Sequence, residues 1–167
     1  MQIRGEIALL ENKFNTFDHC FQTGIHIKVK QIGKANCSTA FIYINYANFL
    51  LQIGNYKKAY DLLDKSAEIL LNLPENHPNL WCLYYVYGCY LLKKKEYKEG
   101  LMNLKNSIWL IENKYDHSHI SILKTRFKYT LALLESGNIE ESKKEFEELD
   151  DKIRVSIIES EKKSKIL

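Results

Sequence analysis

The chain has 167 residues, of which 46% are apolar and 12% aromatic, so it has the length of one ordinary domain and enough material for a hydrophobic core. Its 24 basic and 21 acidic residues are interleaved and leave a formal charge of only +3, which argues against a nucleic-acid partner. Two prolines and seven glycines are too few for a strand-and-turn fold, so the composition indicates a helical protein.

Targeting and membrane signals are not found in the sequence. The opening residues, MQIRGEIALLENK, contain acids and have no small-residue cleavage site, so no signal peptide is predicted. No apolar run approaches the roughly 20 residues that span a bilayer. The four cysteines never form a C-x-x-C pair and are expected to be buried small hydrophobes. We therefore expect a cytoplasmic protein without a membrane contact, and a cytoskeletal association is one form this could take.

An internal repeat of about 42 residues runs along the whole chain. Each copy opens on a small residue, at spacings of 42, 41 and 42: Gly5, Ala47, Gly88 and Thr130. Nine residues later each copy has an apolar ring or branched side chain: Phe14, Tyr56, Tyr97 and Ile139. After three and then four more residues come Phe17, Ala59, Gly100 and Ser142, and Phe21, Leu63, Leu104 and Phe146. A turn is expected in each copy at Asn12, Gly54, Lys95 and Gly137, since glycine is the usual helix stop.

Each copy predicts a helical hairpin within one domain spanning residues 1–167. The expected hairpins, in chain order, are 1–33, 36–74, 78–115 and 118–165. The small residues allow the two helices of a hairpin to approach closely, and one hairpin cannot bury its apolar face alone, so neighbouring hairpins must stack. The tyrosine-rich run Leu80–Leu92 is then the first helix of the third hairpin, and the lysines at 93–95 are its end and turn.

The two ends of the array depart from this pattern. The first copy starts partway through a helix without an N-cap, so we expect that helix either to fray or to be covered by another chain or segment. At the other end, residues 141–166 read as a long second helix that caps the array. Its apolar stripe comprises Phe146, Leu149, Ile153, Ile157 and Ile158.

The repeat resembles the tetratricopeptide repeat (TPR), and its period of about 42 is similar to that of the kinesin-light-chain-like variety. The run LPENHPNL, residues 73–80, is similar to the linker L-G-x-D-H-P-x-[VI]-A of that variety. The resemblance implies an all-α, right-handed superhelical α-solenoid of about four antiparallel hairpins. It also implies a protein-interaction scaffold that binds a peptide or helix in a concave groove lined by the first helices.

The resemblance implies which residues line that groove. They are Phe41, Ile44, Asn45, Asn48, Gln52, Tyr85, Cys89, Lys93, Lys124, Phe127 and Lys128. Asn45 and Asn48 offer amides that can both donate to and accept from a peptide backbone. Some family members grip a terminal carboxylate with two asparagines and three basic residues. Asn48, Lys124 and Lys128 match three of those places, but Ile44 and Val86 replace the other two, so the complete clamp is not expected and a partner with an acidic stretch stays open.

No catalytic or cofactor motif is found. There is no glycine-rich phosphate loop, no G-x-S-x-G and no H-E-x-x-H, and the acids of residues 140–148 lie among lysines on a solvated helix. His117 and His119 have no further ligands at a recognisable spacing, so we expect no metal. The chain is therefore predicted to be neither an enzyme nor a cofactor-binding protein.

Three functions remain compatible with the sequence. The first is an adaptor whose groove holds a partner protein, and we favour it. The second is a small structural subunit built permanently into a large assembly, such as a cytoskeletal or ciliary one. The third is a regulatory TPR-like fragment of a larger enzyme or receptor.

Overall fold

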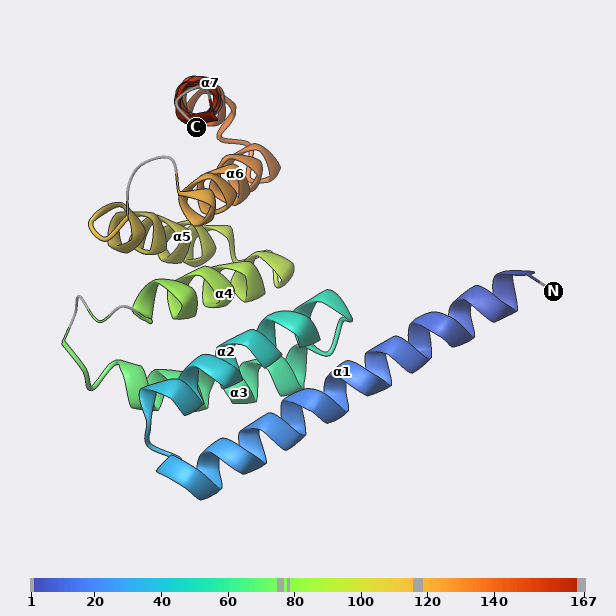
Figure 1. Cartoon of the computed structure of the whole chain (residues 1–167). Coiled ribbons are helices and arrows are strands. Elements are labelled where there is room, and N and C mark those ends of the chain that lie inside the picture. The colour runs from blue at the N-terminus through green and yellow to red at the C-terminus, as the bar shows by residue number, and fades with distance from the viewer. Residues whose placement is uncertain (1, 75–76, 78, 116–118, 165–167) are drawn as a thin grey trace. The chain divides into compact units, whose positions relative to one another are not determined.

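Seven α-helices make up the part of the chain that the computed structural model describes, residues 2–74, 77, 79–115 and 119–164 (Figure 1). They are α1 (Gln2–Ile32), α2 (Cys37–Gln52), α3 (Tyr56–Leu70), α4 (Leu80–Lys93), α5 (Tyr97–Glu112), α6 (Ile120–Glu135) and α7 (Ile139–Ser164). The chain divides into two compact units, Met1–Pro74 with α1 to α3 and Glu75–Leu167 with α4 to α7. Each unit is described by itself.

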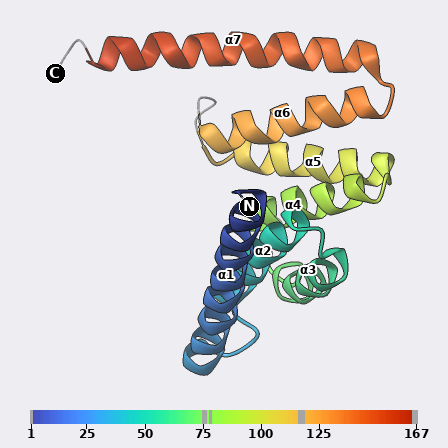
Figure 2. The same cartoon turned by 90° about the vertical axis from the view of Figure 1, so that its right-hand side faces the viewer.

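Three of the four expected hairpins are present: α2 packs on α3, α4 on α5, and α6 on α7. Figure 2 shows α7 running back along α6 after a short turn. The N-cap side chains of α2, α3 and α6 accept hydrogen bonds from backbone N–H groups of the first helical turn. The Asn36 amide oxygen accepts from the Ser38 N–H at 2.8 Å, Asn55 accepts from Lys58 N–H at 3.3 Å, and His119 Nδ1 accepts from Ser121 N–H at 3.2 Å.

The turn inside each of these hairpins contains one residue in the left-handed region. Gly54 and Gly137 have φ values of +80° and +84°, and Lys95 takes the same place in the α4–α5 hairpin with φ of 63°. Glycine adopts this conformation without steric cost, whereas a residue with a Cβ is strained there. The turn positions predicted from the repeat are therefore correct for these three hairpins.

Replacing Lys95 with glycine is expected to stabilise the second unit by about 0.5–1 kcal/mol, because relief of the left-handed strain outweighs the added freedom of the unfolded chain. Urea unfolding followed by the fluorescence of Trp81 and Trp109, the two tryptophans of the chain, measures this change, since both lie in the second unit. The reciprocal change Gly137→Lys should destabilise the unit by a similar amount. A Lys95→Gly variant that unfolds at lower urea than the parent would contradict the expectation.

The first expected hairpin, residues 1–33, is wrong: α1 is one helix of 31 residues that continues through Asn12. The turn sequence contributes to this, but a missing glycine is not sufficient by itself, because the α4–α5 hairpin turns at Lys95 without one. Asn12 stands between Glu11 and Lys13, and no glycine or proline interrupts the helix there. The helix ends only at Gly33, whose φ is +84°.

The small residues of the repeat lie where the paired helices touch. A Cβ added to Gly88 would lie 3.0 Å from Leu104 Cγ and 3.1 Å from the Gly100 carbonyl oxygen. Ala47 and Ala59 are fully buried at the same contact in the α2–α3 hairpin. In the last hairpin the Ser142 hydroxyl donates to the Thr130 carbonyl at 3.0 Å. The repeat therefore encodes close helix contact in all three hairpins.

The α2–α3 and α4–α5 hairpins each contain the same side-chain hydrogen bond. Ser66 donates to the Ala40 carbonyl at 3.3 Å, and Ser107, in the equivalent place, donates to the Trp81 carbonyl at 2.9 Å. Each bond ties a second helix to the start of its first helix. Both serines are buried: this bond satisfies the Ser107 hydroxyl, whereas the Ser66 hydroxyl also donates to the Leu62 carbonyl of its own helix at 2.7 Å.

Charged side chains join the three last helices. Arg126 on α6 pairs with Glu112 on α5 at 2.8 Å and with Glu145 on α7 at 2.9 Å, and Lys152 on α7 also reaches Glu112 at 3.1 Å. The hydrogen bond from Arg126 Nε to Glu112, at 2.9 Å, makes the contact two-pronged. This network fixes α5, α6 and α7 to one another within the second unit.

The long final helix covers α6 less completely than expected of a cap. Leu149 is buried, but Phe146 and Ile153, on the same predicted stripe, are exposed. Ile157 and Ile158 lie outside the residues whose side chains the structure describes. Cysteine burial is also only partly as predicted, because Cys82 is buried whereas Cys20 on α1 is exposed.

Candidate functional site

In the first unit, the predicted groove residues of α2 form one exposed ridge. Phe41, Asn45, Asn48 and Gln52 follow at helical spacing on one side of the helix; all are exposed except Asn48, which is half-buried. Neither Asn45 nor Asn48 is hydrogen-bonded to another residue in the described part of the chain. Both amides are therefore available to a ligand.

Ile44 is not part of this ridge. It is only 1% exposed and continues the buried stripe of α2 that includes Ala40, Ala47 and Leu51. Its prediction as a groove residue is wrong because it lies one helical turn from Ala47, on the side that packs on α3. Ile44 also stands at one of the places of the carboxylate clamp, and because it is buried it could not contact a ligand there.

In the second unit, the predicted residues of α4 are less open than those of α2. Tyr85 and Cys89 are half-buried and Lys93 is exposed. Tyr85 packs against the core formed by residues that include Leu92 and Tyr129. Burial is the main cause that raises the pKa of Tyr85 to about 12, and the nearby Cys89 adds to the effect.

The Cys89 thiol is not set up as a nucleophile. Burial raises its pKa above the ordinary value, and the nearby charges of Lys128 and Lys93 only partly oppose this effect. A thiol with a raised pKa stays protonated at neutral pH, whereas reactivity requires the thiolate.

The exposed face of α6 carries more apolar surface than the sequence analysis found. Lys124 and Phe127 are exposed and Lys128 is half-buried, as expected of groove residues. Ile120 and Leu134, which were not predicted, lie seven residues to either side of Phe127. Ile120 is 57% exposed, Leu134 is 54% exposed and Phe127 is 49% exposed. The signal that could have found them is this seven-residue spacing, because positions i and i+7 share a helix face.

The apolar stripe of Ile120, Phe127 and Leu134, with Lys124 and Lys128 beside it, is called the α6 ridge below. Exposed aromatic and aliphatic side chains on one helix face are a feature of many interaction sites. The adjoining lysines give the ridge a local positive charge.

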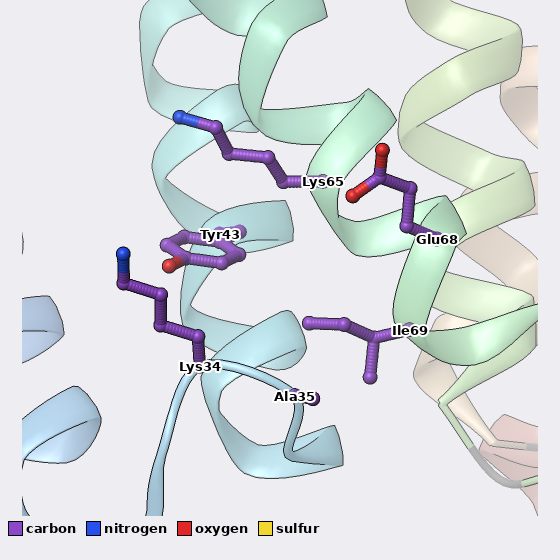
Figure 3. A pocket seen from close by; sticks show the side chains of 6 residues that line it. All are labelled: Lys34, Ala35, Tyr43, Lys65, Glu68 and Ile69. Carbon is purple, nitrogen blue, oxygen red and sulfur yellow. The ribbon is translucent and has the colours of Figure 1, made fainter.

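A pocket of about 320 Å³ lies in the first unit at one end of the α2–α3 hairpin (Figure 3). Lys34 and Ala35 come from the loop after α1, Tyr43 comes from α2, and α3 contributes Lys65, Glu68 and Ile69. Two ammonium groups and one carboxylate leave a single positive charge. Tyr43 is buried, so the aromatic ring forms part of the core as well as of the pocket wall.

Metal-ligating side chains are not grouped in the described part of the chain. No three histidine, cysteine or acidic side chains of that part of the chain are grouped so that they could hold a metal ion. His119 caps α6 and stacks on Tyr115 with ring centroids 4.3 Å apart; His117 lies outside the described residues. Among the described helices, none is both long and apolar enough to cross a membrane.

Comparison with known proteins identifies the fold. No protein-family model matches the chain, and no curated protein sequence matches it. Two crystal structures of nearly identical TPR-like repeats, described as those of a kinesin light chain from Podosopora anserina, resemble it in three dimensions. The first, a point variant, has a TM-score of 0.70 at 15% identity and covers 84% of this chain. The second has a TM-score of 0.58 at 15% identity and covers 90%.

The chain spans 66% of the first of these structures, just under two thirds of its length, and 70% of the second. At this level of identity the similarity shows the fold alone. The expectation of an all-helical, TPR-like α-solenoid of the kinesin-light-chain-like kind is confirmed. A fold of this kind can carry many unrelated functions.

Proposed function

We propose that this chain is a non-catalytic adaptor that binds an amphipathic peptide or helix of a partner protein on the first-helix faces of its hairpins. The observation that supports the proposal most strongly is the α6 ridge. Ile120, Phe127 and Leu134 expose apolar surface at a spacing that matches one face of a helix, and Lys124 and Lys128 adjoin it. A partner segment would bury this apolar surface and pair acidic side chains with the lysines.

The ridge of α2 would contribute in a different way. Asn45 and Asn48 can donate to and accept from a peptide main chain, and Phe41 offers an aromatic contact beside them. The proposal treats the α2 ridge and the α6 ridge as separate contributions, each made by its own unit.

The proposal predicts which peptides bind. Helical peptides that carry leucine or phenylalanine at every seventh position with flanking glutamates should raise the melting temperature of the protein at concentrations above their Kd, whereas peptides with the same apolar residues and flanking lysines should not. Removing the aromatic anchor with Phe127→Ala should weaken binding at least tenfold, about 1.4 kcal/mol.

Matched controls separate the ridge from the remaining surface. Met102 on α5 is an exposed apolar residue outside the ridge, and Met102→Ala should leave peptide affinity unchanged. The double change of Lys124 and Lys128 to glutamate should reverse the preference between glutamate-flanked and lysine-flanked peptides. Failure of every amphipathic peptide to raise the melting temperature, or equal loss of affinity in the Phe127→Ala and Met102→Ala variants, would refute the proposal.

A second function, permanent incorporation into an assembly, is favoured by the exposed apolar side chains of the last helix. Phe146 takes the place that Leu63 and Leu104 occupy in the preceding hairpins, where both leucines are fully buried. An assembly partner that covers Phe146 would make the third hairpin equivalent to the others. Under this alternative the isolated protein should self-associate or aggregate through α7, and Phe146→Glu should relieve this.

A further inference from the structure

One face of α1 is left open where its counterparts in the other second helices are covered. Phe17 occupies the place of Ala59, Gly100 and Ser142, each of which is buried against the first helix of its own hairpin. Phe17 itself is 55% exposed, and Phe14, one turn before it, is exposed too. Because α1 runs straight through Asn12, residues 2–12 lie ahead of this face on the same helix and cannot fold back over it.

The side of α1 toward α2 is well packed. The rings of Phe21 and Tyr46 stack with centroids 5.0 Å apart, and Phe17 meets the ring of Phe49 at 5.7 Å. The Asp18 carboxylate accepts a hydrogen bond from the Tyr46 hydroxyl and pairs with Lys58 Nζ at 3.3 Å. These contacts hold the second half of α1 on α2 in one register, so that the open face is a fixed surface.

Residues 5–11, GEIALLE, have the sequence of a first helix. Gly5 matches Ala47 and Gly88, and Leu9 matches Leu51 and Leu92, which are buried in their hairpins. The chain thus contains a helix that is patterned to cover a second helix and, directly after it, a second helix whose Phe14 and Phe17 contact the ring of Phe49 on α2 but stay exposed. The continuous helix keeps the two apart.

We propose that two copies of this chain pair through α1 in antiparallel orientation, each laying residues 2–12 over Phe14 and Phe17 of the other. The exchange gives both copies the hairpin contact that the missing turn denies them, as in other domain-swapped pairs. The same surface is used on both copies, so the interface is isologous and the assembly is a closed dimer that cannot extend into a filament.

The register of the other hairpins fits this pairing in shape. In each of them the small residue of the first helix faces the residue twelve positions later: Ala47 with Ala59, Gly88 with Gly100, and Thr130 with Ser142. The same register across the two copies sets Gly5 opposite Phe17. Gly5 has the smallest side chain among the equivalent first-helix positions, and Phe17 has the largest among the equivalent second-helix positions. The ring of Phe17 can therefore occupy the space above Gly5.

The same register is mixed in charge. It sets Arg4 opposite Asp18 of the second copy, but at the twofold axis it sets Glu11 opposite Glu11 of the second copy, with the two Lys13 residues within one helical turn of that pair. The Asp18 carboxylate already pairs with Lys58 and accepts hydrogen bonds from Tyr46 and Gln22, and 35% of its side chain stays exposed. Twofold symmetry forms each contact twice, and antiparallel helices also oppose their dipoles favourably.

Sedimentation velocity of the full chain over a range of concentrations tests the proposal. The parent protein should have the mass of two chains, and Phe17→Glu should shift it to one, because two buried carboxylates would face apolar surface. The double change Asn12→Gly and Lys13→Asn installs the Gly-Asn turn found at Gly54-Asn55 and Gly137-Asn138. This variant should also be monomeric and should keep its helical content in circular dichroism, since each chain can then form its own first hairpin.

The control is Met102→Glu, which places the same charge at an equally exposed apolar residue on α5 and should leave the dimer intact. If Phe17→Glu loses helical content, the turn variant decides the question by itself. A parent chain that stays monomeric at every concentration would overturn the proposal and would leave the face of Phe14 and Phe17 to a different partner. A turn variant that remains dimeric would overturn it as well.

Discussion

Replacing Arg126 with alanine is expected to lower the free energy of unfolding of the second unit by about 3 kcal/mol, the scale found when one partner of a mostly buried ion pair is removed. Only 12% of the Arg126 side chain is exposed, and it pairs with Glu112 and Glu145 from two neighbouring helices. Without the guanidinium, the Glu145 carboxylate loses its close partner and Glu112 keeps only Lys152. Urea unfolding followed by tryptophan fluorescence measures the loss.

Arg154→Ala provides the matched control. Arg154 pairs with Asp150 at 2.8 Å, the same distance as the Arg126–Glu112 contact, but 71% of its side chain is exposed. An exposed pair within one helix contributes about 0.3–0.5 kcal/mol, so this variant should be close to the parent in stability. Equal losses in the two variants would show that the network does not hold α5, α6 and α7 together.

The stabilisation from the network should also depend on pH. Burial acts to raise the pKa of Glu112, but hydrogen bonds and charges from Arg126 and Lys152 outweigh it, so the pKa lies below its ordinary value. A carboxyl with a lowered pKa contributes stability that is present above its unfolded pKa and is lost as the pH falls through its folded pKa. The stability difference between the parent and Arg126→Ala should therefore shrink in acid.

Gly88→Val is the second substitution with a large expected effect, a loss of about 2–3 kcal/mol in the second unit from overpacking. The first added carbon alone would lie 3.0 Å from Leu104 Cγ and 3.1 Å from the Gly100 carbonyl oxygen. Leu104 is fully buried and the carbonyl belongs to the α5 backbone, so neither can move away without opening the hairpin. The same fluorescence-monitored urea unfolding measures the loss.

The same substitution at Gly24 is the control, because nothing lies within 4 Å of a Cβ added there. Gly24→Val on α1, in the first unit, should change stability by less than about 0.5 kcal/mol when unfolding is followed by circular dichroism, since valine and glycine differ little in helix propensity. A Gly88→Val variant as stable as the parent would mean that α4 and α5 do not approach as closely as the structure shows.

These expectations depend on features that the repeat could predict to different degrees. Small residues at equivalent places predicted the contact of Gly88 with Gly100, because only close helix packing selects glycine or alanine in the middle of helices. The ion pairs of Arg126 could not be predicted, since its partners lie 14 and 19 residues away and no sequence pattern links them. The tertiary arrangement of three helices decides that contact.

In the candidate site, too, some features could be predicted from the sequence and others depend on how the helices pack. The resemblance to TPR proteins implied Phe41, Asn45 and Gln52 as groove residues, and all three are exposed on α2. Spacing could not separate Ile44 from Asn48, which lie close together on the α2 helical wheel, because the difference depends on where α3 packs. The exposure of Ile120 and Leu134 likewise depends on which side of α6 is covered.

The sequence by itself determined the helical class, the period of about 42 residues and three of the four turns, because these depend on local conformation and on the small residues that close packing requires. Only the tertiary structure decided that α1 continues through Asn12. A turn without glycine is a weak local signal, and there the favourable extension of a helix prevails over the repeat. The same extension leaves Phe17 uncovered, and so decides which surface the molecule has available for a second copy.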